Sequence, residues 1–363
     1  MNAILCKPGR PRLAQAATWF ALCAALPLSP AWGAPGKWEM AAPMPQAMGE
    51  VVGVAVNTSL FVFGGLNNAG GSLPYGAAFR FDEDSSRWTV LKPMPEPAHH
   101  LMATALGGKI YLFGGFVAGG LPKPTWKPSG GAWEYDPATD TYRALAPLPR
   151  ARGAGYAVTL GDKIYVMGAV AASVDGKTSA PIALGGPLGQ TVVGWVDEYD
   201  VASNTWRPRA TMPTPRNHFM AAEAGGKIYA LDGRTGSVFV NQAAITDLVE
   251  AYDPARDSWA LASRAGVARG DVNGAALDGV IFMTGGESQS DIGKTTYWAF
   301  EAYDPRANAW TALPHLQITR HGFAAAFIGN KLHVVGGSFQ SDGMPGILSP
   351  TATHEVYEVR KTN

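Results

Sequence analysis

One pattern of glycines, arginines and aromatic residues recurs six times along the chain. Each unit has a strand-like segment that ends at a glycine doublet or its equivalent, and the first residues of these doublets are Gly64, Gly114, Gly168, Asp232, Gly285 and Gly336. Sixteen residues before each doublet lie Met48, Ala98, Arg152, Arg216, Arg269 and Arg320. Ten residues further back lie Trp38, Trp88, Tyr142, Trp206, Trp259 and Trp310. Constant spacing of this kind indicates a repeat architecture built from one supersecondary unit.

Each unit contains four short segments that are rich in β-branched and aromatic residues, a composition that predicts strands. The first turn is GGK, GDK or GNK in most units, and the third segment ends in a Tyr-Asp pair in most. Four strands in about 50 residues predict one blade of a β-propeller. We expect the blades at about residues 48–88, 98–142, 152–206, 216–259, 269–310 and 320–359.

The two ends of the repeat complement each other. Trp38 has no tyrosine seven residues before it, and Tyr357 has no tryptophan after it. We therefore expect residues 37–47 to complete the last blade and close the ring. Closure would remove exposed strand edges, which otherwise invite aggregation.

The glycine doublets, the Tyr-Asp-Pro turns and the spaced tryptophans resemble the kelch-repeat β-propeller family over residues 37–359. The resemblance implies an all-β, six-bladed propeller that forms a single domain over residues 34–363. Two doublets depart from the family pattern, Gly168-Ala169 and Asp232-Gly233, without changing the register. The repeat signature implies a fold and says little about function.

Residues 1–33 have the pattern of a secretory signal peptide. Lys7, Arg10 and Arg12 form a positive region, and an apolar stretch over residues 13–28 follows without a charge. Small residues within Ala31-Trp32-Gly33 precede an expected cleavage before Ala34. This predicts export to the periplasm or the extracellular space, without membrane insertion after cleavage. A retained membrane anchor is the alternative reading.

Charge and cysteine content exclude several classes of function. The 29 lysines and arginines balance 29 acidic residues, and no basic block suggests binding to nucleic acid. Both cysteines, Cys6 and Cys23, lie in the expected signal peptide. The mature chain would therefore lack a disulfide, a thiolate metal site and a cysteine nucleophile.

The loop between the second and third strand of each unit varies most in length, and it includes long loops at residues 117–130 and 170–194. Length variation confined to one face of a propeller marks the binding face. The arginines of the repeat precede the first strand, which is the strand nearest the axis, and so should converge on a central mouth. The predicted ligand-binding residues there are Arg152, Arg216, Arg269, Arg320, His99, Asn217, Glu50 and Asp271.

A cluster of guanidinium groups in a partly desolvated concavity favours carboxylate, sulfate or phosphate. We therefore expect an acidic saccharide, or an acidic peptide of a protein partner, as the ligand. The alternative is that each arginine pairs with a carboxylate or with carbonyls of a neighbouring blade. His99, His100, His218 and His321 could bind a metal or transfer protons. We expect no metal and no cofactor, because the histidines come from three blades and the adjacent arginines would repel a cation.

Two catalytic readings follow from resemblance. Galactose oxidase has a kelch-type propeller, but its copper-radical chemistry needs a cysteine that the mature chain lacks. Secreted bacterial sialic acid mutarotases, or N-acetylneuraminate epimerases, are similar six-bladed propellers, and "MTGGESQSDIGK" puts Glu287 where that family has its acid/base. The resemblance implies that Glu287 would shuttle the proton, with His218 or His321 as the second candidate for this role, and that the arginines would hold the sugar carboxylate. The family's arginine is replaced by Gly293 and Lys294, so a non-catalytic binding propeller is the main hypothesis and a mutarotase the alternative.

Overall fold

The computed structural model describes residues 36–67, 73–120, 125–172, 182–183, 191–235, 244–290, 293–341 and 349–360. These residues belong to one compact unit and form strands, turns and coil, with no helix among them. Within this part of the chain there is accordingly no helix that could cross a membrane. The expected signal peptide at residues 1–33 lies outside the described residues.

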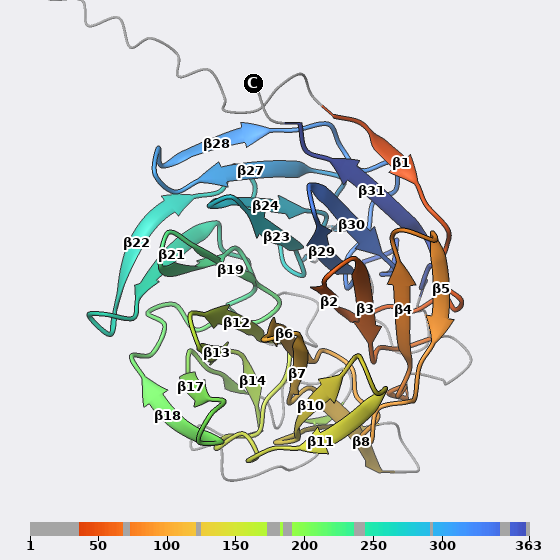
Figure 1. Cartoon of the computed structure of the whole chain (residues 1–363). Helices are drawn as coiled ribbons and strands as arrows, with labels where there is room; N and C mark the ends of the chain where they lie inside the picture. The colour runs from red at the N-terminus through yellow and green to blue at the C-terminus, as the bar shows by residue number, and fades with distance from the viewer. Residues whose placement is uncertain are drawn as a thin grey trace, which may run out of the picture. The chain divides into compact units, whose positions relative to one another are not determined.

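Six four-stranded antiparallel sheets follow one another around a central axis, and each is one blade (Figure 1). Blades 1 and 2 contain β2 (Val52–Val56), β3 (Ser59–Phe63), β4 (Ala78–Asp82), β5 (Arg87–Val90), β6 (Met102–Leu106), β7 (Lys109–Phe113), β10 (Ala132–Asp136) and β11 (Thr141–Ala144). Blades 3 and 4 contain β12 (Tyr156–Leu160), β13 (Lys163–Met167), β17 (Val196–Asp200), β18 (Thr205–Arg209), β19 (Met220–Ala224), β20 (Lys227–Leu231), β21 (Leu248–Asp253) and β22 (Ser258–Arg264). Blade 5 contains β23 (Asn273–Leu277), β24 (Val280–Thr284), β27 (Phe300–Asp304) and β28 (Ala309–Ala312).

Blade 6 combines the two ends of the described chain. Its strand order is β1 (Trp38–Met40), β31 (His354–Glu358), β30 (Lys331–Val335) and β29 (Ala324–Ile328). The outermost strand β1 pairs antiparallel with β31, with Trp38 opposite Tyr357. This confirms the predicted six-bladed propeller and the predicted closure of its last blade by the N-terminal segment.

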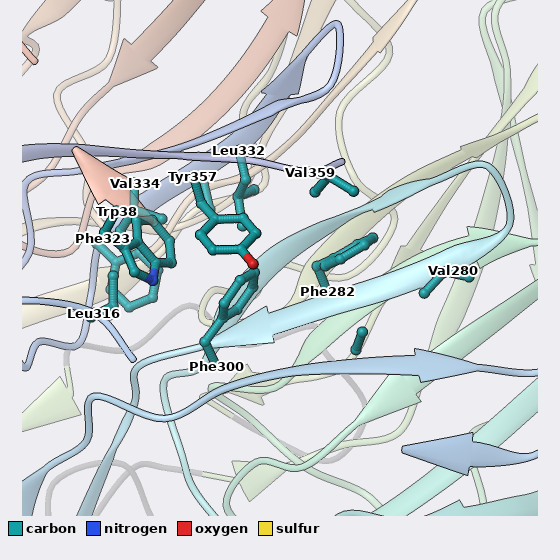
Figure 2. Packing of buried hydrophobic residues seen from close by; sticks show 12 residues of the cluster. Trp38, Val280, Phe282, Phe300, Leu316, Phe323, Leu332, Val334, Tyr357 and Val359 are labelled. Carbon is teal, nitrogen blue, oxygen red and sulfur yellow. The ribbon is translucent and has the colours of Figure 1, made fainter. Parts of the chain in front are cut away.

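Aromatic side chains fill the space between neighbouring blades. In the cluster between blades 5 and 6, the ring of Phe300 lies 5.1 Å from Trp38 and 4.9 Å from Tyr357 (Figure 2). Both contacts are edge-to-face, the arrangement that aromatic quadrupoles favour. Five further clusters of buried side chains include strands of two neighbouring blades in the same way. The apolar residues of the strands therefore join the blades as well as shaping each sheet.

One aromatic residue on the outermost strand of each blade recurs at a constant spacing, and we call these the outer aromatic residues. Their spacing has a structural cause, because each donates a hydrogen bond to the preceding blade. Trp38 Nε1 donates to the Pro314 carbonyl at 2.7 Å and Trp88 Nε1 to the Ala42 carbonyl at 2.8 Å. The acceptor in each case lies four residues after the corresponding aromatic residue of the preceding blade. Equivalent bonds to carbonyls are made by Tyr142, Trp206 and Trp259, whereas Trp310 Nε1 donates to the Ser263 hydroxyl at 3.3 Å. The bond of Trp88 links blade 1 to the N-terminal segment and so spans the closure of the ring.

We predict that Trp88→Phe lowers the free energy of unfolding by about 1–2 kcal/mol, because it leaves the Ala42 carbonyl without its donor and removes packed area. Urea unfolding would measure this change. Trp298→Phe is the matched control, because Trp298 is 57% exposed and its change should stay within about 0.5 kcal/mol. Equal effects of the two substitutions would contradict the role of the bond.

Candidate functional site

The four repeat arginines are fully buried and cross their own blades rather than facing the axis. Arg152 Nη2 lies 2.8 Å from an Asp197 carboxylate oxygen, and the other arginines form the same contact with the third strand of their blades. These ion pairs are Arg216–Glu250, Arg269–Glu301 and Arg320–Glu355. Guanidinium groups also donate to the carbonyls of Asp232, Gly285 and Gly336, where the second strands end.

The expectation that Arg152, Arg216, Arg269 and Arg320 line the mouth is therefore wrong. An ionised group is buried at an acceptable cost only when it is paired and hydrogen-bonded, and each of these is. The partner was readable in the sequence, because an acid stands two residues before the third-strand tyrosine in each blade that has the arginine. In blades 1 and 2 the arginine is replaced by Met48 and Ala98, and the acid by Phe79 and Trp133.

We call the six repeat positions that hold the four arginines, Met48 and Ala98 the arginine register. The residues that face the axis lie two positions after it and form the axial register. They are Glu50, His100, Ala154, His218, Asp271 and Gly322, all with φ between 50° and 62°. These residues form a ring around the axis, and backbone hydrogen bonds link five of them in series from Glu50 to Asp271; Ala154 N–H donates to the His100 carbonyl at 3.0 Å and His218 N–H to the Ala154 carbonyl at 2.9 Å. A cavity of about 70 Å³ lies along the inner strands next to this ring.

Nine polar side chains from five blades meet at this ring, and we call them the axial cluster. They are Glu50, His99, His100, Asn217, His218, Arg234, Asp271, Glu287 and His321. Asp271, one of the more exposed members of the cluster, has only 15% of its side chain accessible to solvent. The sequence-predicted residues other than the four arginines thus come together, including His218, His321 and Glu287.

Asp271 and His321 form an ion pair within the cluster. His321 Nδ1 lies 2.7 Å from Asp271 Oδ2, and His321 Nε2 lies 2.8 Å from the Gln340 carbonyl. Burial is the largest single effect and opposes charge on both side chains, but their hydrogen bond and the neighbouring charges together outweigh it. The pKa of His321 is raised above its ordinary value, and the pKa of Asp271 is lowered. Both ring nitrogens of His321 face acceptors, which is the environment of a protonated imidazole.

His99, His100 and His218 are held in the neutral form. Burial lowers the pKa of His100 to about 4, with Arg234 and His321 adding to the effect and Asp271 opposing it. Burial also places the pKa values of His99 and His218 well below the ordinary range. His100 Nε2 lies 2.8 Å from His218 Nε2 and 3.1 Å from Glu50 Oε2. A neutral imidazole in such a position can accept a proton or coordinate a cation.

Arg234 is a member of the cluster that the sequence analysis missed. Its guanidinium pairs with the Glu287 carboxylate, and both side chains are buried. Gln289 Nε2 donates to Glu287 Oε2 at 3.1 Å. The sequence could have indicated this pair, because Arg234 and Glu287 occupy the same position in their repeats. Each follows the first doublet residue of its blade by two positions.

Short additional strands extend from the second-to-third-strand loops. These are β8 (Phe116–Gly120), β9 (Thr125–Pro128), β14 (Val170–Ala171), β15 (Ile182–Ala183), β16 (Thr191–Val192), β25 (Glu287–Ser290) and β26 (Gly293–Thr296). The Trp126 ring on β9 lies 4.2 Å from the His99 ring and stacks on Phe116. Trp126 therefore lies against the cluster beside blade 2, whereas residues 121–124 of the predicted loop at 117–130 and most of the loop at 170–194 lie outside the described residues.

Four-stranded blades, a ring closed by the N-terminal strand and variable loops over an axial site define a kelch-type β-propeller. The sequence model of the Attractin/LZTR1 beta-propeller family matches residues 60–343. The chain belongs to this family of propellers.

Relatives and solved structures agree with this assignment. Kelch-like protein terF of Aspergillus terreus is 27% identical over 215 residues, which are 58% of this chain and 44% of that protein. Kelch-like protein 23 of Homo sapiens is 28% identical over 213 residues, which are 58% of this chain and 34% of that protein. The chain thus spans less than half the length of these relatives. The structure of YjhT superimposes with a TM-score of 0.70 at 15% identity, covering 90% of this chain and 100% of YjhT, and this likeness concerns the fold.

We predict that Arg320→Ala lowers the free energy of unfolding by about 3–5 kcal/mol, because the fully buried Glu355 would lose its counter-charge. Denaturant unfolding would show the loss. The matched control is Arg306→Ala, because Arg306 is exposed and should change stability by less than about 1 kcal/mol. A stable Arg320→Ala protein would show that the buried pair is dispensable for the fold.

Acidification should destabilise the protein between about pH 6.5 and pH 4. In this window the unfolded chain protonates histidines that stay neutral when folded, so each contributes a loss of up to about 1.4 kcal/mol per pH unit. The histidines with lowered pKa are His99, His100, His218, His333 and His354. His321 acts oppositely, since its raised pKa stabilises the fold below its unfolded pKa and this is lost as pH rises through its folded pKa.

Urea unfolding at pH 7, 6 and 5, with NMR titration of the imidazole C–H signals, would test this balance. We expect the free energy of unfolding to decrease as the pH is lowered. The His321 signal should titrate with a pKa above the ordinary histidine value, and the His100 signal with a pKa of about 4. A stability that does not change over this range would contradict the neutral state of the buried histidines.

Proposed function

We propose that this chain is a ligand-binding propeller that holds a small polar ligand at the axial cluster. The observation that carries the proposal is the convergence of nine polar side chains from five blades in a largely buried position. Burying ionisable groups is costly, and the fold does not require them here, because blades 3 and 6 have Ala154 and Gly322 at the same register. Clusters of perturbed ionisable groups are typical of functional sites.

The charge of the cluster favours a neutral or positively charged ligand. Glu50, Asp271 and Glu287 supply three carboxylates, against the positive charges of Arg234 and protonated His321. The acidic saccharide or acidic peptide expected from the sequence depended on four arginines that are paired within their blades. A hydroxylated molecule, such as a neutral or amino saccharide, would match the acceptors that remain.

A sugar mutarotase is the second candidate, and one contact favours it. Opening a hemiacetal ring needs an acid at the ring oxygen and a base at the anomeric hydroxyl. His321 Nε2 lies 3.7 Å from Glu287 Oε2, so a proton donor and a carboxylate stand side by side at the axis. In this reading Glu287 is the base, His321 the acid, and Arg234 holds Glu287 in place.

Export is a part of the proposal that rests on the N-terminal sequence alone. Residues 7–12 carry the positive charges and residues 13–28 the apolar stretch of a signal peptide. N-terminal sequencing of the mature protein should begin at Ala34 if the proposed cleavage occurs.

Calorimetric titration with neutral, amino and acidic saccharides would test ligand binding. We expect the neutral or amino sugars to bind best, and Asp271→Asn and His321→Gln to weaken binding at least tenfold. His315→Ala, which changes an exposed histidine outside the cluster, should leave binding unchanged. The proposal fails if no saccharide binds, or if the cluster variants bind as the unmodified protein does. For the second candidate, NMR should show faster anomer exchange with the protein and none of this acceleration with Glu287→Gln.

A further inference from the structure

Two histidines and a glutamate of the axial cluster form a compact donor set. The ligand atoms of Glu50, His100 and His218 all lie within 4.8 Å of one another. We propose that these three side chains bind one divalent transition-metal ion. The inference rests on the proposed function only in placing a binding site at the same cluster, and it names a ligand that the proposed function does not require.

A nitrogen atom of His218 and an oxygen atom of Glu50 lie close to His100 Nε2. His218 Nε2 lies 2.8 Å from it, and a Glu50 carboxylate oxygen lies 3.1 Å from it. A neutral imidazole has one hydrogen, so His100 can make a good hydrogen bond with one of these two acceptors. A metal ion between the three atoms would satisfy all of them. The two imidazole nitrogens would have to move apart by roughly 0.5 Å to reach a tetrahedral arrangement at Zn–N distances of about 2.0–2.1 Å.

Asn217 sets the tautomer of His218. Asn217 Nδ2 donates to the Arg234 carbonyl at 3.3 Å, which leaves its amide oxygen facing His218 Nδ1 at 2.7 Å. Because an amide oxygen only accepts, Nδ1 of His218 carries the hydrogen and Nε2 presents its lone pair to the axis. Metal-ligating histidines are typically held in this way by an acceptor behind the ring.

The backbone at all three ligand positions adopts a conformation that L-residues seldom use. The φ angles of Glu50, His100 and His218 are 56°, 53° and 50°, and the equivalent residue of blade 6 is Gly322. Glycine adopts this conformation without a steric penalty, whereas other residues there cost free energy. Large polar side chains at strained positions are frequent at functional sites. Ala154 has the same conformation at this register, so the positive φ belongs to the repeat, and it directs the three donor side chains to the axis.

The donor chemistry indicates the class of ion. Two neutral imidazoles and one carboxylate are a ligand set that zinc uses with a further position open to water or substrate. Nitrogen donors of this kind favour first-row transition metals over magnesium or calcium. The repulsion expected from Arg152, Arg216, Arg269 and Arg320 does not apply, because these arginines are paired elsewhere. The cation Arg234 is balanced by Glu287.

A second group, Glu50 with Asp271 and His321, has a similar spacing but a different character. Asp271 holds His321 through a hydrogen bond of 2.7 Å. The ring nitrogens of His321 both face oxygen acceptors, so this histidine has hydrogens where a ligand would need a lone pair. We therefore assign Asp271 and His321 to the surroundings of the metal site, and Glu50 alone of this group to its ligands.

The test is metal binding by the full-length mature protein without a histidine tag. After treatment with a chelator and dialysis, zinc chloride is titrated by calorimetry, and bound metal is counted by mass spectrometry after gel filtration. We expect one zinc ion per chain, and X-ray absorption should show two imidazole ligands. Glu50→Gln, His100→Ala and His218→Ala should each lower zinc affinity more than a hundredfold, and Asn217→Ala should lower it 10–100-fold.

His315→Ala and His354→Ala are the matched controls, since each removes a histidine outside the cluster, and both should bind zinc with unchanged affinity. Less than a tenth of an equivalent of bound zinc would overturn the proposal, as would unchanged affinity in the three ligand variants. Saccharide titration of the chelator-treated protein separates the two proposals. Saccharide binding without zinc binding would overturn only the metal site, whereas stoichiometric zinc binding without any saccharide binding would overturn only the proposed function.

Discussion

The pairing of β1 with β31 is the constraint on which the rest of the structure depends. It pairs Trp38 with Tyr357, from the two ends of the described chain, and gives the last blade its outermost strand. The blade-to-blade hydrogen bonds continue through this closure, from Trp38 to Pro314 and from Trp88 to Ala42. A site at the axis exists only because the ring is closed, since Glu50 and His321 are distant in sequence and meet only there.

The fold could be predicted from the sequence because each of its repeated residues has a local structural role. Constant intervals between the doublets and the outer aromatic residues reflect the length of the strands and the reach of the bond between blades. Closure was predictable for the same reason, because Trp38 and Tyr357 each lacked the partner that the other supplied. A pattern that recurs in every blade reports on architecture, and this one did.

The candidate site was predicted in part, and the error is instructive. The positions one and two residues after the arginines bring His99, Asn217 and Asp271 together, and Glu287 joins them from the position two residues after the first doublet residue of its blade. The direction of the arginine side chains was not predicted correctly, because recurrence in four blades was interpreted as convergence on a ligand. The acid two residues before the third-strand tyrosine appears in the same four blades. That joint occurrence within one blade indicates an internal ion pair, and it required no structure to see.

The arginines inside the blades and the ionisable side chains of the axial cluster differ in how their charges are balanced. Each arginine inside a blade pairs with a carboxylate on the third strand of its own sheet and donates to backbone carbonyls, so its charge is balanced locally, and Arg269 also lies 3.8 Å from the Asp232 carboxylate of blade 4. In the axial cluster, three carboxylates share one arginine and one protonated histidine, and three neighbouring histidines stay neutral. The axis therefore keeps an excess of acceptors, which a ligand or a cation with donors or positive charge can use.

Three consecutive residues of blade 4 show how closely structure and function are placed in this fold. Arg216 extends outward to Glu250 and stabilises the blade, while Asn217 orients an imidazole through its amide oxygen. His218 extends inward to His100 at the axis. The positive φ of His218 separates these directions by turning the chain just before the inner strand begins. The two registers therefore vary independently, since blades 1 and 2 present Glu50 and His100 at the axis although Met48 and Ala98 replace the arginine.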